Sequence, residues 1–318
     1  MNLAARRWIV AVILGLLGFS TVPADAGMTD AEVKAFESYK TEAEKGDRIA
    51  QFNLGVSYYF GDGVEKNFLQ AATWYRKAAE AGIASAQCNL GLMYDNGDGL
   101  AEDDTEAVKW YRKAADQGHA EALSNLGVMY YSGEGVPKDA VEASKLWRKA
   151  ADQGHAAAQS KLGHIYYNGE GVPKDYAEAA RWYRKAAEQG RAFSQYFLGT
   201  MHDDGEGMPV DDTEAVKLYR KAADQGLAVA QYFLGRMYAK GEGVPQDDIE
   251  AYAWYNLAAV SNESARKIRD AAGSRLPSEA KLIAQQRTKQ LQQEIENREI
   301  ERLKKEDQKQ REKMLKGA

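Results

Sequence analysis

The histidines and the cysteine, which could perform catalysis or bind a metal, are few and widely spaced. The chain has four histidines, and no two of them have the i,i+4 spacing that places two metal ligands on one helix face. Asp203 and Asp204 are adjacent carboxylates, but neighbouring residues of a helix point in different directions, which does not suit a paired general acid and base. No nucleophile elbow, phosphate-binding loop or Cys-x-x-Cys motif is present. The sequence therefore predicts no catalytic residue, no cofactor and no metal ion.

Two further candidates for chemistry are explained by their place in a repeated pattern. Cys88 is the only cysteine, which excludes an intramolecular disulfide, and it occupies a variable position of the pattern. We interpret it as a structural thiol. His119 and His155 share another repeated position, directly after a glycine, so the repeat accounts for both histidines.

The pattern has a period of 36 residues. A leucine followed by a glycine recurs at this spacing without a gap, and a long fixed period of this kind is typical of stacked repeats rather than of one globular core. The six pairs are Leu54–Gly55, Leu90–Gly91, Leu126–Gly127, Leu162–Gly163, Leu198–Gly199 and Leu234–Gly235.

Each unit contains two amphipathic segments that are predicted to be helices. In the fourth unit the first segment runs from Ala156 to Asn168, and its apolar positions fall on one helical face. A loop with two glycines follows, and the second segment starts at Asp175, a good N-cap residue. Gly163 lies inside the first helix, where glycine costs about 1 kcal/mol relative to alanine. Because every unit repeats this cost, we expect a neighbouring helix to pack closely against this position.

The repeated pattern closely resembles the Sel1-like repeat family, a relative of tetratricopeptide repeats. It reads A-x-A-Q-x-x-L-G-x-M-Y-x-x-G-x-G-V-P-x-D-x-x-E-A-x-x-W-Y-R-K-A-A-x-Q-G and covers about residues 43–276. The resemblance implies an all-α fold, a right-handed α/α solenoid of six 36-residue Sel1-like repeats with a long charged C-terminal helix. It also implies an adaptor role in multiprotein complexes, and bacterial members resemble regulators of envelope and exopolysaccharide systems.

The segments that flank the repeats have distinct characters. Residues 1–26 combine Arg6 and Arg7, an apolar run and an Ala-x-Ala site, which predicts a cleaved signal peptide and a periplasmic or secreted protein. An uncleaved membrane anchor is the alternative. The expected domains are an N-terminal capping helix at 27–46, the six repeats at 47–262 and C-terminal capping helices at 263–288. In the latter, Leu282, Ile283 and Ala284 are expected to cover the end of the stack.

The last segment, 289–318, is a charged tail with nine Lys or Arg and seven Asp or Glu residues. Its apolar residues Leu291, Ile295, Ile300 and Leu303 do not hold a heptad pattern. A single solvated helix, a coiled coil through which the chain self-associates, and a partly disordered tail all fit this composition.

The net charge of −5 also bears on the partner. Because the tail is slightly basic, the rest of the chain is more acidic than this figure. An acidic body argues against nucleic acid and anionic membranes as partners, and no membrane span is expected after cleavage of the signal peptide.

Positions that vary between repeats are free to serve recognition. On the first helix they are the positions equivalent to Ile49, Phe52, Val56, Tyr59 and Phe60, which lie on one helical face. In tetratricopeptide-like solenoids, which this chain resembles, that face lines a concave groove. Aromatic and charged side chains there suit a protein or peptide partner, although some of these rings could instead pack between adjacent first helices. The predicted partner-binding residues are Ser160, His164, Tyr167, Phe193, Tyr196, Thr200, Asp203, Val229, Tyr232, Arg236 and Lys240.

These observations predict a non-enzymatic scaffold of the bacterial envelope that binds a protein or peptide in the groove of the solenoid. The alternative is an envelope enzyme or a protein that binds peptidoglycan or a related glycan.

Overall fold

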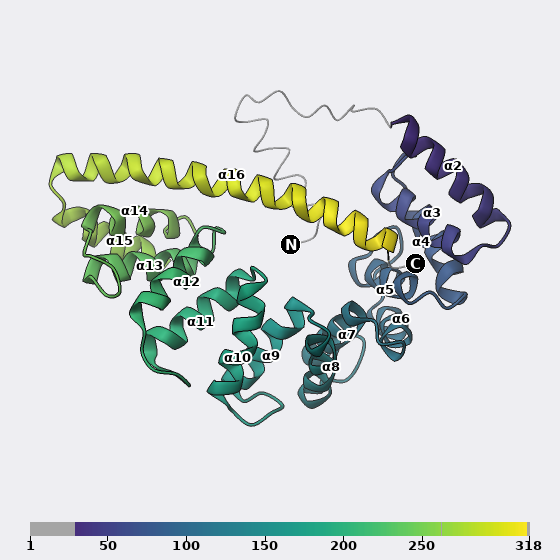
Figure 1. The fold of residues 1–318 in the computed structure, drawn as a ribbon, viewed down its shortest axis with the longest axis horizontal. Helices are drawn as coiled ribbons and strands as arrows, with labels where there is room; N and C mark the ends of the chain where they lie inside the picture. The colour runs from purple at the N-terminus through teal and green to yellow at the C-terminus, as the bar shows by residue number, and fades with distance from the viewer. Residues whose placement is uncertain (1–28, 262, 317–318) are drawn as a thin grey trace. The chain divides into compact units, whose positions relative to one another are not determined.

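The computed structural model describes residues 29–261 and 263–316, and in these residues the regular structure is helical throughout. The predicted signal peptide lies outside the described residues. Figure 1 labels these helices in chain order. They form two compact units. Unit 1 contains the helices up to Asp139 and the end of the chain from Lys305, and unit 2 contains Ala140–Lys304.

In unit 1 each helix packs against the next one along the chain. The first of them, α2, begins at the N-cap Thr29, whose side chain accepts a hydrogen bond from the backbone of Glu32. Phe36 and Ala43 of α2 are buried against α3, so α2 covers the first repeat. The helices are α2 (Asp30–Glu44), α3 (Arg48–Phe60), α4 (Phe68–Glu80), α5 (Ala84–Asn96), α6 (Asp104–Asp116) and α7 (Ala120–Ser132).

Unit 2 continues the same alternation of first and second helices and ends in a long helix. Consecutive helices again pack together from α8 to α15, and the first helices α9 and α11 also contact each other. The helices are α8 (Ala140–Asp152), α9 (Ala156–Asn168), α10 (Tyr176–Glu188), α11 (Ala192–Asp204), α12 (Asp212–Ala223), α13 (Ala228–Lys240), α14 (Asp248–Ala258), α15 (Glu263–Arg275) and α16 (Ser278–Lys316), of which the residues up to Lys304 belong to unit 2.

The glycine inside the first helix lies against a tyrosine ring of the second helix. A Cβ atom added to Gly163 would lie 2.5 Å from Cδ1 of Tyr183, and Tyr183 is almost completely buried. The pairs Gly199–Tyr219 and Gly235–Tyr255 repeat this contact in unit 2. The prediction that a neighbouring helix packs against the glycine position is therefore confirmed.

The ends of the helices follow the predicted capping pattern. The Asp175 side chain accepts a hydrogen bond from the backbone N–H of Glu178 at 2.9 Å, and Asp211 and Asp247 cap their helices in the same way. At the other side of the loop, Gly169 ends α9 in the left-handed region with φ 78°, where glycine is strongly favoured. In these repeats the chain turn between the two helices is therefore set by a glycine at the end of the first helix and an aspartate at the start of the second.

The C-terminal part of unit 2 differs from the prediction at two residues. Ala284 is buried, but Leu282 is 57% exposed and Ile283 is 46% exposed, so the expectation that all three cover the stack is wrong for these two. The reason is helical geometry. Residues 282 and 283 lie outside the helical face that Ala284 shares with the residues four and seven positions later, and that face packs against the stack. Those residues, Thr288 and Leu291, are buried in their place.

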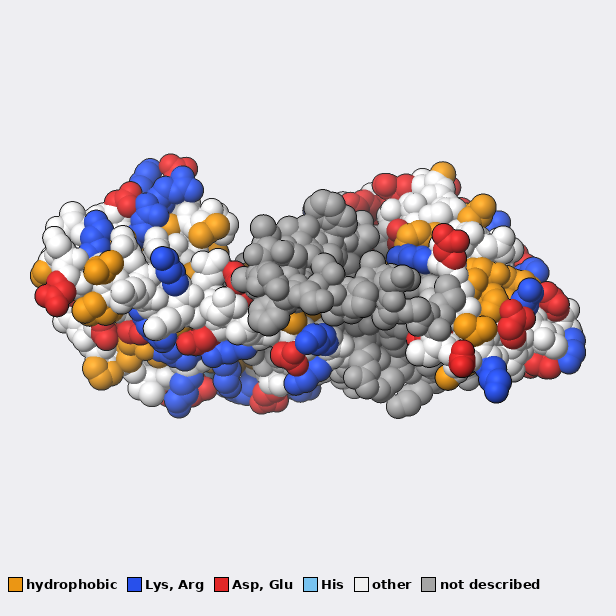
Figure 2. All heavy atoms as spheres, turned by 90° about the horizontal axis from the view of Figure 1, so that it is seen from above, with side chains coloured by type: hydrophobic (Ala, Val, Ile, Leu, Met, Phe, Trp, Pro, Cys, Tyr) orange, Lys and Arg blue, Asp and Glu red, His pale blue; other side chains and the backbone are white. Residues whose placement is uncertain are grey.

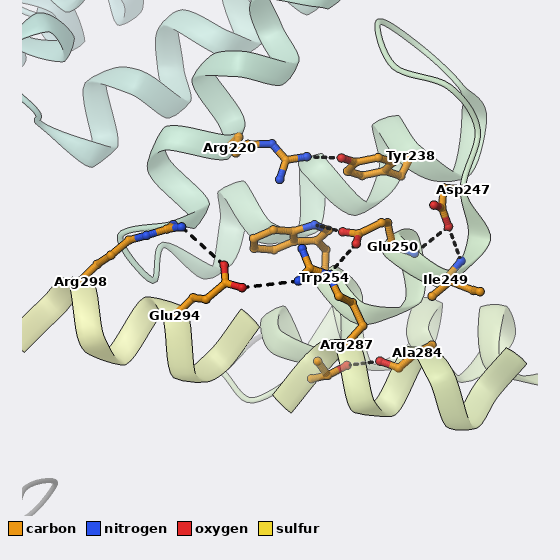
Figure 3. A network of polar contacts seen from close by, with 11 residues as sticks. Arg220, Tyr238, Asp247, Ile249, Glu250, Trp254, Ala284, Arg287, Glu294 and Arg298 are labelled. Atoms are coloured by element: carbon orange, nitrogen blue, oxygen red, sulfur yellow. Dashed lines mark hydrogen bonds and ion pairs between the residues drawn. The ribbon is translucent and has the colours of Figure 1, made fainter. Parts of the chain in front are cut away.

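The charged tail therefore begins as part of the packed structure. The helix that holds Ala284 continues without a break past residue 289, and Leu291 belongs to the buried cluster of α12, α13 and α14. Ile295 packs against the same cluster. The segment around Arg287, Glu294 and Arg298 lies along these helices with polar contacts (Figure 3).

Charged side chains of both signs lie on the surface, as expected from a chain with 28% charged residues. Figure 2 shows one face, on which Lys or Arg and Asp or Glu side chains are interspersed over both units. None of the helices in the described part of the chain combines the length and the apolar character needed to cross a bilayer.

We expect Gly163→Ala to destabilise the protein. Helix propensity alone favours alanine by about 1 kcal/mol, but overpacking of a filled core costs about 1–3 kcal/mol, and the new methyl group would overlap the Tyr183 ring. The urea midpoint, followed by circular dichroism, should fall. Lys161→Ala, an exposed change in the same helix, is the control and should leave it almost unchanged. A midpoint of Gly163→Ala above the wild-type value would contradict the packing role of the glycine.

Candidate functional site

The predicted partner-binding residues lie on three first helices of unit 2, namely α9, α11 and α13. Rings connect these helices to each other. The ring centroid of Phe197 on α11 lies 6.1 Å from that of His164 and 6.0 Å from that of Tyr167, both on α9. The Tyr196 ring on α11 lies 5.5 Å from the Phe233 ring on α13 in an edge-to-face arrangement. The structure thus connects four predicted residues, His164, Tyr167, Tyr196 and Tyr232, through the rings of Phe197 and Phe233.

Phe197 and Phe233 were not among the predicted residues, yet they hold this arrangement together. Phe197 stacks on the buried Tyr183 ring at 5.2 Å, and Phe233 lies 5.4 Å from the Tyr219 ring. The repeat contains a signal for both. The equivalent position holds asparagine in the first three repeats, lysine in the fourth repeat and phenylalanine in the last two repeats. We call His164, Tyr167, Tyr196, Phe197, Tyr232 and Phe233 the aromatic face.

A buried ion pair lies beside the aromatic face. The carboxylate of Asp203 accepts hydrogen bonds from the Tyr219 hydroxyl at 3.0 Å and from the Arg236 guanidinium. The Asp203 side chain is only 9% exposed, and the Arg236 guanidinium lies over the Phe233 ring at 4.8 Å. Because both partners are largely removed from water, this pair connects α11 to α13 and fixes the position of the Arg236 side chain.

The acidic end of α11 continues past the ion pair. Asp204 is exposed, and its pKa is raised by partial burial and by the nearby charges of Asp203 and Glu206. The pKa of Tyr167 is also raised, first by burial and then by its hydrogen bond with Glu206. Asp204 and Glu206 therefore add negative charge beside the rings, and Arg236 partly offsets it at Asp204.

The other predicted residues divide into exposed and packed side chains. Phe193 is 60% exposed and Lys240 is exposed with its ammonium 3.2 Å from Glu242, so both are accessible. Thr200 is buried and donates a hydrogen bond to the backbone of Phe197. The half-buried residues are Ser160, whose hydroxyl accepts a hydrogen bond from Ser194 at 2.8 Å, Val229, and Tyr232, whose ring packs 5.4 Å from Phe233.

The candidates for chemistry have structural roles in the described part of the chain. His119 and His155 each accept a hydrogen bond from a backbone N–H three residues later, at 3.3 Å, and so serve as helix N-caps. Cys88 is buried. Among the described residues no group of three or more His, Cys, Asp or Glu side chains is placed to hold a metal ion.

The helix pairs coincide with a known repeat. The Sel1 repeat family model matches residues 48–83, 84–119, 120–155, 156–190, 192–227 and 228–259, which together make up well over half of the chain. The chain is a Sel1 repeat protein. Its fold is the predicted α/α solenoid, and Sel1 repeat proteins are generally scaffolds for protein interactions.

Two solved structures of Sel1 repeat proteins are similar to this one. The first is c5321, a protective antigen present in uropathogenic Escherichia coli strains that displays an SLR fold, with 39% identity, a TM-score of 0.72, and coverage of 78% of this chain and 54% of that chain. The second is a Sel1 repeat protein from Oxalobacter formigenes, with 35% identity, a TM-score of 0.65, and coverage of 74% and 95%. This chain thus spans about half the length of the E. coli protein. No curated protein sequence matches it.

Two aspartates in the same position of different repeats should respond differently to mutation. Asp203→Asn leaves Arg236 without its buried charge partner and should cost about 1–3 kcal/mol of stability. Asp95 also accepts a hydrogen bond from a buried tyrosine, Tyr111, at 3.0 Å, but Val128 stands where the later repeat has Arg236.

The expected result for Asp95→Asn is therefore neutral or slightly stabilising at pH 7. Burial is the main cause that raises the pKa of Asp95, so ionisation disfavours the folded state. This penalty develops as the pH rises from the unfolded-state pKa to the raised pKa. Urea denaturation of both variants at pH 7 provides the test. Equal losses of stability would show that Arg236 does not distinguish the two sites.

Proposed function

We propose that this protein is a non-enzymatic scaffold that binds a protein or peptide on the aromatic face of α9, α11 and α13. The observation that supports this most directly is the exposure of Phe193 beside that face. Phe193 lies three and four residues before Tyr196 and Phe197 on α11, so its exposed ring extends the aromatic face. Apolar side chains exposed singly are common, and it is this continuity with other rings that favours an interaction surface. Aromatic rings held by a rigid framework are also the residues that most often dominate protein interfaces.

The arrangement of the face favours a partner with both apolar and charged groups. The rings form the centre, while Asp204 and Lys240 provide accessible charges at its edge. Because the rings pack on fixed tyrosines of the second helices, little conformational entropy is lost when a partner binds. A preorganised surface of this kind suits recognition rather than catalysis.

The glycan-active alternative is less well supported by the site. Hydrolysis of a glycosidic bond generally requires two carboxyl groups on either side of the bond. Asp203 already bonds to Tyr219 and Arg236, so the adjacent pair provides one accessible carboxylate, Asp204. The proposal therefore assigns no reaction to these residues.

We further propose that the scaffold works in the bacterial envelope. The support is the pattern of residues 1–26, with its basic start, short apolar run and Ala-Asp-Ala site.

A comparison of two variants tests the binding surface. Phe193→Ser combined with Lys240→Glu should abolish capture of the partner, because it removes the exposed ring and reverses the accessible charge. Ile49→Ser is the matched control, since Ile49 is 41% exposed at the equivalent position of the first repeat. Crosslinking in the native envelope would identify the partner by mass spectrometry. Capture that survives the double substitution but fails with Ile49→Ser would move the site to unit 1.

Export can be tested separately on the natural protein. We expect the mature protein to begin at Gly27 and to fractionate with the periplasm or the medium. N-terminal sequencing of the protein from its own host decides this. A mature protein that starts at Met1 and remains in the cytosolic fraction would exclude the envelope role without affecting the binding surface.

A further inference from the structure

The first part of α16 is held on unit 2 by a stripe of residues with helical spacing. Ala284, Thr288 and Leu291 are buried, and Ile295 packs beside Leu227 in the same apolar cluster. The stripe ends at Arg298, whose guanidinium lies 2.7 Å from the carboxylate of Asp224 at the end of α12. Spacings of three and four residues place all five side chains on one face of the helix.

Beside this stripe, Arg287 forms a second polar contact between α16 and the stack, with Glu250 of α14. The Nε atom of Arg287 donates to Glu250 at 2.6 Å, and the indole N–H of Trp254 donates to the same carboxylate at 3.1 Å (Figure 3). Glu250 is 19% exposed and Arg287 is 29% exposed at the side chain. The pair is thus largely sheltered and binds α16 to α14.

The same site occurs two repeats earlier with a different arginine. There Glu178 accepts the indole N–H of Trp182 at 2.8 Å and the guanidinium of Arg148 at 3.1 Å. Arg148 belongs to the second helix of the preceding repeat and also donates to the hydroxyl of Tyr166. In this repeat the glutamate is therefore bound by the stack itself.

Arg220, in the second helix of the fifth repeat, is the residue that corresponds to Arg148. It donates to Tyr238, as Arg148 does to Tyr166, and its guanidinium lies 5.8 Å from the Trp254 ring. Glu250 bonds to Arg287 of α16 instead (Figure 3). Thus α16 occupies a contact for which the stack carries its own arginine. If α16 leaves, Arg220 can rotate to Glu250, so a buried carboxylate need not lose its partner.

The short segment between α15 and α16 also favours exchange of α16 between two copies of the chain. Only Leu276 and Pro277 lie between α15 and α16. Short hinge segments of this kind favour domain swapping, because the helix that leaves one chain finds an identical site on another. Leu291 is buried and Ile295 packs beside it in the same cluster, and the same apolar contacts form again when the helix binds to a second copy.

We propose that the surface formed by Asp224, Glu250 and Trp254 is a helix-docking site that can receive α16 from a second copy of this chain. In the swapped dimer Arg287 and Arg298 of each copy bind the carboxylates of the other. The partner copy then supplies the side chains that complete the end of the stack.

Complementation between two variants of the full chain tests this. The donor variant carries Glu250→Gln and Asp224→Asn, which removes its docking carboxylates and leaves its α16 intact. The amide that replaces the Glu250 carboxylate can still accept the Trp254 hydrogen bond, which protects the fold. The acceptor variant carries Arg287→Glu and Arg298→Glu, which repels its own α16 and leaves the docking site intact. A chain with all four substitutions is the control.

Sedimentation should show that each variant alone has the monomer mass and that an equimolar mixture doubles it. The control chain should not associate with either variant. Hydrogen exchange of residues 284–298 in each variant should be faster than in the wild type. If the acceptor variant fails to fold, Arg287→Gln with Arg298→Gln replaces it. A mixture that stays monomeric while both helices exchange rapidly would overturn the proposal, and so would an α16 that remains protected in the acceptor variant.

Discussion

A glycine of the first helix packs against a tyrosine ring of the second helix, and this contact sets the distance between the two helices of a repeat. It occurs at Gly55, Gly91, Gly163, Gly199 and Gly235. A Cβ atom at any of these glycines would lie 2.5–2.9 Å from the ring, closer than two carbon atoms can approach. The helices are therefore nearer to each other than an alanine would allow. The ring fills the space beside them, and this compensates for the cost of about 1 kcal/mol of a glycine within a helix. Each repeat buries its apolar surface only on its neighbours. The spacing of the two helices therefore also determines which of their side chains are exposed.

Variation on this fixed framework gives the repeats different properties. Asp95 and Asp203 hold equivalent tyrosines through the same hydrogen bond, but only Asp203 meets an arginine from the next first helix. Similarly, Glu178 binds an arginine of the stack, whereas Glu250 binds Arg287 from α16. In both comparisons the framework is unchanged, and one nearby side chain decides which segment of the chain the carboxylate binds.

The sequence predicted what is encoded locally and repeated. The helix pairs, the Asp175 type of N-cap and the close approach at Gly163 all follow from short-range patterns, and the structure confirms them. The face of α9, α11 and α13 could be placed because helical spacing determines which side chains share a side. Phe197 and Phe233 were missed because the comparison considered five variable positions and not the neighbouring one that changes from asparagine to phenylalanine.

Contacts between distant segments were not predictable in the same way. Asp203 and Arg236 are 33 residues apart, and their pairing depends on how two first helices are stacked. The stripe of α16 was overlooked because the heptad test began at Leu291, after the stripe had started at Ala284. Leu282 and Ile283 were expected to be buried on the basis of hydropathy alone, but the direction of the helix exposes them.

The central claim is that recognition takes place on the aromatic face of a rigid stack. Its most direct test is hydrogen exchange of the full chain with and without its captured partner. The account predicts slower exchange in residues 192–204 and 228–240 when the partner is bound, with the equivalent segment 48–60 unchanged. Slower exchange only in 48–60, or only in 278–304, would contradict it and assign recognition to another part of the chain.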